Sequence, residues 1–218
     1  KYQTDNQSKI LWCVGWSGSG KSKTMDILKQ ELAVNASIQY ILPSFMPEGA
    51  DAIQVMANHI FSQLNPCQKD IVIVDGWDEK QESVPKLASA LISLVNSSNE
   101  TMLLIISGTK GSKYLNQEYI TRRFTGAVRE NISADVFLDS LNGTSEYKEL
   151  FSLAPVVIVP FLPLEKDHVT RCLRQEFKRA KKMHHSGLLR VVNGAVFHGD
   201  IDENVVKALM SSLNFVPK

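Results

Sequence analysis

Short runs of consecutive apolar residues alternate along the chain with longer segments of helical period. Mostly apolar runs predict strands at 10–14, 38–42, 70–75, 101–106 and 156–159. Helical period covers 22–34, 50–64 and 85–95, and the polar stretch 112–147 is helical in parts. Strands that alternate with helices are typical of a parallel sheet covered by helices. We therefore predict an α/β fold with a five-stranded parallel sheet.

The last quarter of the chain has a different pattern. Residues 164–182 and 201–213 again show helical period, and residues 188–199 between them predict a loop or a hairpin. This pattern indicates a small helical appendage after the sheet. We predict a large domain at residues 1–163 and a small helical domain at residues 164–218.

Charge and composition exclude some partners. The chain has 218 residues with 24 basic and 23 acidic side chains, so its net charge of +1 indicates neither a nucleic acid nor an acidic membrane as partner. No run is apolar and long enough to predict a transmembrane segment. The chain starts almost at its first strand, so we expect any targeting segment to lie outside it.

Glycosylation sequons are more frequent than chance predicts. Six of the twelve asparagines begin the pattern N-x-[ST], where about two would be expected from the serine and threonine content. They are Asn6, Asn35, Asn96, Asn99, Asn131 and Asn142. The excess favours a chain of the secretory pathway, and a cytosolic protein with fortuitous sequons is the alternative.

Three cysteines, Cys13, Cys67 and Cys172, are too few for a disulfide framework. Cys13 lies inside the first apolar run and is interpreted as a small buried hydrophobe.

The segment between the first strand and the first helix matches the phosphate-binding loop G-x-x-x-x-G-K-[ST]. Glycines let backbone N–H groups turn towards a phosphate, and the following helix directs its positive end to the same place. Lys21 supplies a charge for the β and γ oxygens, and Ser22 can bind Mg²⁺. The alternative is a Gly/Ser-rich turn that precedes a helix by chance. We assign nucleotide binding to Gly15, Trp16, Ser17, Gly18, Ser19, Gly20, Lys21, Ser22 and Thr24.

The apolar strand at residues 70–75 has the Walker B form, because it ends in the carboxylate of Asp75. A carboxylate at the carboxyl end of a central strand can hold the Mg²⁺ that bridges nucleotide phosphates. We therefore predict that Ser22 and Asp75 bind Mg²⁺ together with ATP. A strand-ending aspartate that caps a turn is the alternative.

Three blocks of sequence resemble the torsins, AAA+ ATPases of the endoplasmic reticulum and nuclear envelope. The blocks are the loop that begins Gly15-Trp16, the segment 159–165 (VPFLPLE) followed by His168 and Cys172, and the final segments 201–203 and 214–218. The resemblance spans nearly the whole chain but is dense only in these blocks.

The resemblance implies an AAA+ core with strand order 5-1-4-3-2, a small helical lid from about Leu164, and ATP–Mg²⁺ held between them. It also implies a location in the lumen of the endoplasmic reticulum or nuclear envelope. Protein partners would be like subunits or membrane-anchored luminal activator domains, and the activity would be ATP hydrolysis linked to chaperone-like remodelling.

The sequence departs from the torsin pattern where hydrolysis is assisted. After the Walker B aspartate the family has a glutamate that polarises water, and here that position is Gly76. Asp78 or Glu79 could substitute for it, although we favour the interpretation of Asp78 as a helix N-cap. The γ-phosphate sensor, an asparagine in the family, is replaced by Gly108, which leaves Thr109 as the nearest candidate. We therefore expect slow or absent intrinsic hydrolysis.

Other departures concern the arginine finger and the end of the chain. No arginine lies between residues 145 and 160, and the family's Gly-Cys-Lys sensor would fall beyond Lys218. Cys172 aligns with the cysteine that pairs with that sensor, and we favour a buried helical thiol. Ser22 is a better Mg²⁺ ligand than the asparagine usual in torsins.

A P-loop kinase of a small substrate is a remote alternative. Strand, loop and helix alone do not separate kinases from ATPases. Such kinases carry clustered arginines in a mobile lid, and this chain has Arg122, Arg123 and Arg129.

Overall fold

The computed structural model describes residues 7–33, 36–64, 69–78, 82–183, 190–192 and 195–197. The chain divides into two compact units, Lys1–Pro163 and Leu164–Lys218.

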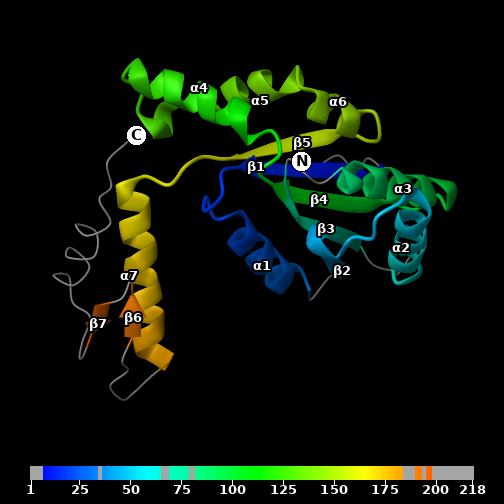
Figure 1. Cartoon of the computed structure of the whole chain (residues 1–218), viewed down its shortest axis with the longest axis horizontal. Coiled ribbons are helices and arrows are strands. Elements are labelled where there is room, and N and C mark those ends of the chain that lie inside the picture. Colours follow the sequence, from blue (N-terminus) through cyan, green and yellow to red (C-terminus); the bar gives the residue numbers. More distant parts are fainter. Residues whose placement is uncertain are drawn as a thin grey trace. The chain divides into compact units, whose positions relative to one another are not determined.

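The first unit contains a five-stranded sheet in which every pair of neighbouring strands is parallel (Figure 1). Its strands are β1 (Lys9–Gly15), β2 (Ala36–Ile41), β3 (Lys69–Trp77), β4 (Met102–Gly108) and β5 (Val156–Phe161). Their order is β2-β3-β4-β1-β5, which is the expected order 5-1-4-3-2 in reverse. The predicted fold class, an α/β fold with a five-stranded parallel sheet of this order flanked by helices, is confirmed.

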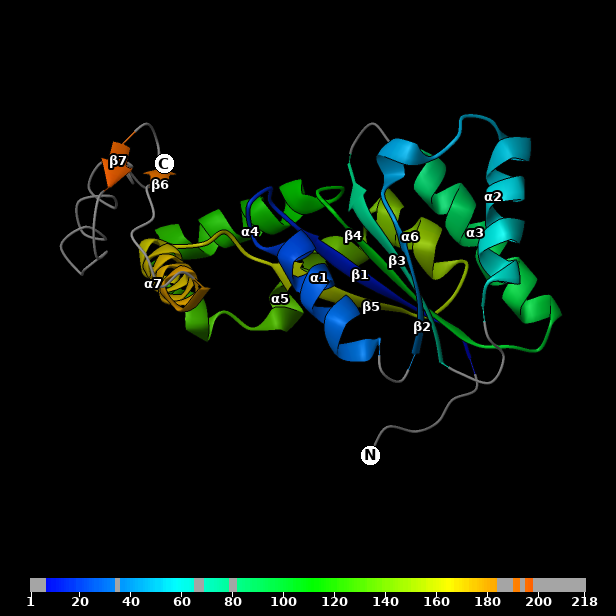
Figure 2. The ribbon, with the colours of Figure 1, turned by 90° about the horizontal axis from the view of Figure 1, so that it is seen from below.

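Six helices cover the two faces of this sheet. They are α1 (Lys21–Leu32), α2 (Ala50–Ser62), α3 (Ser83–Ser97), α4 (Ser112–Phe124), α5 (Ala134–Asn142) and α6 (Ser145–Phe151), and short 3-10 turns occur at η1 (Pro43–Phe45) and η2 (Arg129–Asn131). Helix α1 packs on one face, where Met25 meets Cys13, Ile73 and Ile105. Figure 2 shows α1 in front of the strands. Residues of α2–α6 pack in a separate hydrophobic cluster on the other face of the sheet.

Successive side chains of each strand point to opposite faces, and this alternation assigns the residues of β1. Ile10, Trp12 and Val14 belong to the cluster that α2–α6 cover, whereas Cys13 belongs to the cluster under α1. Because the parallel strands pair in register, their carboxyl ends meet at one edge of the sheet. The loop to α1 leaves β1 at this edge.

Strands β3, β4 and β5 are longer than the sequence predicts. Strand β3 continues past Asp75 to Trp77, and β4 continues to Gly108. The predicted break at residues 107–111 is therefore wrong at its first two residues, because the extended end of β3 pairs with them. Strand β5 passes through Pro160, which an edge strand tolerates since one row of its backbone groups has no neighbour.

The second unit contains α7 (Lys166–Met183) and a two-stranded antiparallel hairpin of β6 (Arg190–Val192) and β7 (Ala195–Phe197). Cys172 is exposed on α7, so the interpretation as a buried thiol is wrong. It lies on the polar side of the helix, where Arg171 and Arg174 are also exposed. Cys67 and the predicted helix at 201–213 lie outside the described residues.

A search of the described residues for membrane spans finds no helix that combines the length and the apolar character needed to cross a bilayer.

Candidate functional site

The phosphate loop connects the end of β1 to the start of α1 through five residues. Gly18 and Gly20 have φ angles of +77° and +95°, a left-handed conformation that glycine adopts without strain. The backbone N–H and the hydroxyl of Ser19 both donate to the Trp16 carbonyl, at 3.2 and 2.7 Å. At its start, a Cβ on Gly15 would overlap the carbonyl oxygen of Phe161 on β5. The glycine spacing therefore serves the loop conformation and the close contact of β1 with β5.

Lys21 is held at the centre of this loop. Its side chain donates to the carbonyl oxygens of Gly15 at 2.7 Å and Trp16 at 2.6 Å, and it lies 3.4 Å from the Ser19 hydroxyl. The residue is 8% exposed. Burial lowers the pKa of Lys21, while the charge of Asp75 acts in the opposite direction. An incoming phosphate would supply the negative charge that this buried ammonium lacks.

Part of the loop and of the first turn of α1 is exposed to solvent, whereas Ser19 is buried. Trp16, Ser17, Gly18 and Ser22 are exposed, with 41% of the Trp16 surface accessible. Thr24 is half-buried, and its hydroxyl donates to the Gly20 carbonyl at 3.0 Å. The structure thus places all nine predicted nucleotide-binding residues in one loop and helix start, with Lys21 beneath it.

Asp75 is the acidic group of the site and is buried on β3, with 5% of its surface exposed. One of its oxygens accepts a hydrogen bond from the Tyr40 hydroxyl on β2 at 2.5 Å. Burial raises the pKa of Tyr40, and the bond to Asp75 adds to this rise. Tyr40 is not recognisable as a site residue from the sequence, because its contact with Asp75 arises only when β2 pairs with β3. The bond fixes one carboxylate oxygen and leaves the other lone pairs as acceptors for a cation.

Cys13 lies on the same face of the sheet. Burial, and secondly the charge of Asp75, raise the pKa of its thiol to about 12. The thiol therefore stays protonated at neutral pH and packs as a small hydrophobe, as the sequence predicts.

After Asp75, strand β3 makes a bulge. Gly76 has a φ angle of +124°, and the register of β3 against β4 shifts between Asp75 and Trp77. The Trp77 side chain is 1% exposed and packs against Trp12, with the ring centroids 6.0 Å apart at an angle of 45°. The residue that follows Gly76 is therefore part of the hydrophobic core.

The Trp77 backbone closes the end of β4. Its carbonyl accepts the N–H groups of Thr109 at 2.8 Å and Lys110 at 3.1 Å. A Cβ at Gly108 would overlap this carbonyl oxygen and lie 2.6 Å from the carbonyl carbon. No side chain fits at position 108, where the torsin resemblance implies an asparagine, because the backbone of Trp77 occupies the space.

Asp78 directly follows β3 and is half-buried. Helix α3 begins at Ser83 and its N-cap residue is Glu82, so the interpretation of Asp78 as a helix N-cap is wrong. Glu79, the other predicted substitute for the catalytic glutamate, lies outside the described residues.

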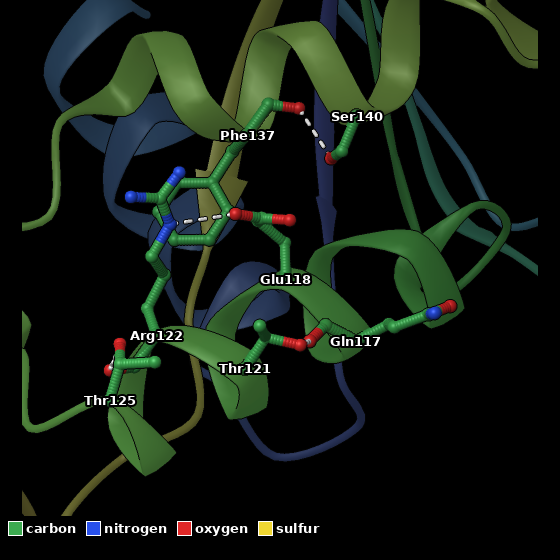
Figure 3. A network of polar contacts seen from close by, with 7 residues as sticks. All are labelled: Gln117, Glu118, Thr121, Arg122, Thr125, Phe137 and Ser140. Carbon is green, nitrogen blue, oxygen red and sulfur yellow. Dashed lines mark hydrogen bonds and ion pairs between the residues drawn. The ribbon is translucent and has the colours of Figure 1, made fainter.

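The arginines behind the kinase alternative lie at and beyond the end of α4. Arg122 pairs with Glu118 at 2.8 Å one turn earlier, and Arg123 donates to the Ala127 carbonyl at 2.8 Å. Figure 3 shows Arg122 directed towards Glu118, and the Thr121 and Thr125 hydroxyls also bond within α4 and its end. Arg122 and Arg123 therefore stabilise the end of α4.

No family model matches the chain. Many solved structures resemble it, and in three of them the alignment covers 94% of this chain. A chain of the E. coli MS115-1 HORMA:CdnC:Trip13 complex has a TM-score of 0.44 and 8% identity over 56% of its length. Cdc6p from Pyrobaculum aerophilum has a TM-score of 0.47 and 13% sequence identity, and the alignment covers 48% of its length. A DNA replication initiation factor has a TM-score of 0.42 and 9% sequence identity, and the alignment covers 50% of its length. The chain spans about half the length of these proteins.

Replacement of Lys21 by methionine tests the loop. We expect Lys21→Met to weaken ATP–Mg²⁺ binding by about 100-fold or more, because a buried charge-assisted contact to phosphate is lost. Lys23→Met is the matched control, since Lys23 is exposed on the same helix, and we expect it to stay within about twofold of wild type. Isothermal titration of the three proteins measures this, and equal losses in both variants would contradict the assignment.

A second prediction concerns the contact between β3 and β4. Gly108→Ala should lower the free energy of unfolding by about 2 to 3 kcal/mol, because the new methyl group displaces the Trp77 carbonyl from its hydrogen bonds. Gly143→Ala is the control, since nothing lies within 4 Å of a Cβ there and its φ angle is −81°. Urea denaturation compares the two, and similar losses would contradict the steric argument.

Proposed function

We propose that the chain is a torsin-like AAA+ protein that binds ATP–Mg²⁺ through residues 15–22 and Asp75. Its nucleotide state governs assembly with protein partners, and its intrinsic hydrolysis is slow or absent. One observation carries this proposal. At the edge where the strands end, the charge of Asp75 acts on Lys21 at the start of α1, while the neighbouring Gly76–Trp77 bulge excludes a side chain at Gly108.

Nucleotide binding is supported by the state of the two charged groups. Lys21 is buried under the loop and donates hydrogen bonds to carbonyl oxygens there. Burial lowers the pKa of Lys21, and the negative charge of the buried Asp75 carboxylate acts to raise it, which favours the charged ammonium. Asp75 and the exposed hydroxyl of Ser22 are oxygen ligands of the type that Mg²⁺ prefers. The ion, when bound with ATP, neutralises charge on the β and γ phosphates. Tyr40 holds the carboxylate of Asp75 in a fixed orientation for it.

Weak hydrolysis is supported by the two glycine positions. Gly76 supplies no carboxylate to take a proton from water, and a general base contributes about 10² to 10⁴ in rate. Gly108 supplies no polar group, and the Trp77 backbone leaves no room for one. Among the described residues, the loop keeps the groups expected to bind phosphate, whereas Gly76 and Gly108 offer no side chain to activate water.

The compartment and the partners rest on the torsin resemblance and the sequons. Asn96, Asn99, Asn131 and Asn142 are all exposed in the structure, which is what glycosylation requires. We propose a luminal location in the endoplasmic reticulum or nuclear envelope. Partners would be membrane-anchored luminal activator domains or like subunits, and residues 164–218 would act as the lid.

Single-turnover hydrolysis at saturating ATP–Mg²⁺ tests the proposal, with and without a luminal activator domain. We expect the chain alone to turn over at about 0.1 s⁻¹ or slower, against a typical enzyme rate near 10 s⁻¹, because general-base assistance is missing. Brisk hydrolysis by the chain alone would contradict this part of the proposal.

The alternative, a competent ATPase, is separated by mutation of the carboxylates after β3. Under that alternative Asp78→Ala or Glu79→Ala abolishes turnover and leaves nucleotide affinity nearly unchanged. We expect neither variant to change the rate by more than about twofold, since slow background hydrolysis needs no positioned base. Asp51→Ala, at an exposed acidic residue in the first turn of α2, controls for loss of a surface charge.

A further inference from the structure

Tyr40 brings a hydroxyl group from the edge strand β2 to the acidic group of the site. It pairs in register with Ile73 of β3, and Asp75 lies two residues further along that strand. Residues two apart on a strand share a face of the sheet, so Asp75 lies on the face of Tyr40 and Ile73. The hydroxyl donates to Oδ2 of Asp75 at 2.5 Å, a length typical of a hydroxyl bonded to a carboxylate.

The ring that carries this hydroxyl is held in place by its surroundings. Tyr40 is half-buried and packs against the cluster under α1. The ammonium of Lys29 on α1 lies 5.2 Å from the ring centroid, which is within cation–π distance. A phenol keeps its proton at neutral pH, so Tyr40 acts as the donor in its bond to Asp75.

The bond affects how Asp75 can bind a cation. Only 5% of the Asp75 surface is exposed, and Oδ2 is engaged by Tyr40. A cation that uses both oxygens of this carboxylate must turn Oδ2 away from Tyr40 and break the bond. A cation that uses Oδ1 alone leaves the bond intact. The contact therefore favours binding through one oxygen.

Mg²⁺ and Ca²⁺ make different demands on a carboxylate. Mg²⁺ requires near-ideal octahedral geometry, keeps several water ligands and is usually bound by one or two carboxylates together with phosphate oxygens. Ca²⁺ takes about six to eight oxygen ligands in flexible geometry, and carboxylates often bind it through both oxygens. Hydrogen bonds to a ligating carboxylate are thus a means of tuning the bound ion.

We propose that Tyr40 is a positioning residue that makes the site select Mg²⁺ over Ca²⁺ as the ion bound with ATP, by holding Oδ2 of Asp75 away from the cation. This inference rests on the proposed function and deepens it. It predicts that removal of one hydroxyl group, which is not itself a metal ligand, changes the preference between two ions.

The test is Tyr40→Phe in the full chain, which removes the hydroxyl and keeps the ring beside Lys29. Isothermal titration measures ATP binding at saturating Mg²⁺, at saturating Ca²⁺ and with a chelator. We expect wild type to bind ATP more tightly with Mg²⁺ than with Ca²⁺. In the variant, affinity with Ca²⁺ should rise about 10-fold, because Ca²⁺ no longer has to break a bond to a charged group. Affinity with Mg²⁺ should stay within about threefold, and affinity with the chelator should not change.

Tyr147→Phe is the matched control. Tyr147 on α6 is also half-buried, but it stacks on Phe151 and packs against the cluster on the opposite face of the sheet. We expect its ion preference to equal that of wild type. Urea denaturation of both variants without nucleotide reports any loss of stability separately from the binding data.

Several outcomes would overturn the inference. An unchanged ratio of the Mg²⁺ and Ca²⁺ affinities in Tyr40→Phe would show that the hydroxyl does not control the ion. Equal losses in all three titrations, with a lower urea midpoint, would make the bond to Asp75 a structural link between β2 and β3. Wild type that binds ATP equally well with Mg²⁺ and with the chelator would remove the ion from the site while nucleotide binding stands. Wild type that binds no ATP in any titration would overturn the proposed function itself.

Discussion

The close approach of the Trp77 carbonyl to Gly108 determines the shape of the strand ends. The carbonyl bonds to two successive N–H groups after β4, so β3 must extend past Asp75 and bulge to reach them. The bulge requires the positive φ angle of Gly76, and it turns the Trp77 ring into the core against Trp12. Trp12 in turn lies within 3.0 Å of where a Cβ on Gly111 would be. The contact between the Trp77 carbonyl and Gly108 therefore requires glycine at positions 76, 108 and 111 and determines how Trp12 and Trp77 pack.

This arrangement separates two tasks that share one edge of the sheet. Alternation along the strands sends Trp12 and Trp77 to the face covered by α2–α6, and Cys13 to the face of α1. The bulge begins only after Asp75, so it leaves the hydrogen bonds of Lys21 to the loop carbonyls undisturbed. The packing of the two tryptophans thus shapes the strand ends without altering the loop.

Much of the fold could be predicted because buried parallel strands have mostly apolar sequences. The loop could be predicted because its glycines, lysine and serine match a known pattern between a strand and a helix. The strand ends could not. Asp75-Gly76 and Ser107-Gly108 look like breaks in sequence, and only their mutual pairing keeps them in the sheet. Tyr40 bonds to a residue 35 positions away, so its role depends on strand order. The exposure of Cys172 could not be predicted, because α7 is so polar that its sequence does not show which side of the helix is buried.

A nucleotide that is not consumed can still control assembly, provided that the protein binds ATP and ADP with different free energies. The difference between the two ligands is the terminal phosphate and the charge that accompanies it. On the α1 side of the strand ends, Lys21 is a buried cation of the loop and Asp75 is a buried acidic group whose charge acts on it. Gly76 and Gly108 contribute no side chain, so under the proposed function the difference in affinity between ATP and ADP would come from the groups that bind the nucleotide. Partners that stabilise one nucleotide state would then act on an equilibrium and need no hydrolytic cycle within this chain.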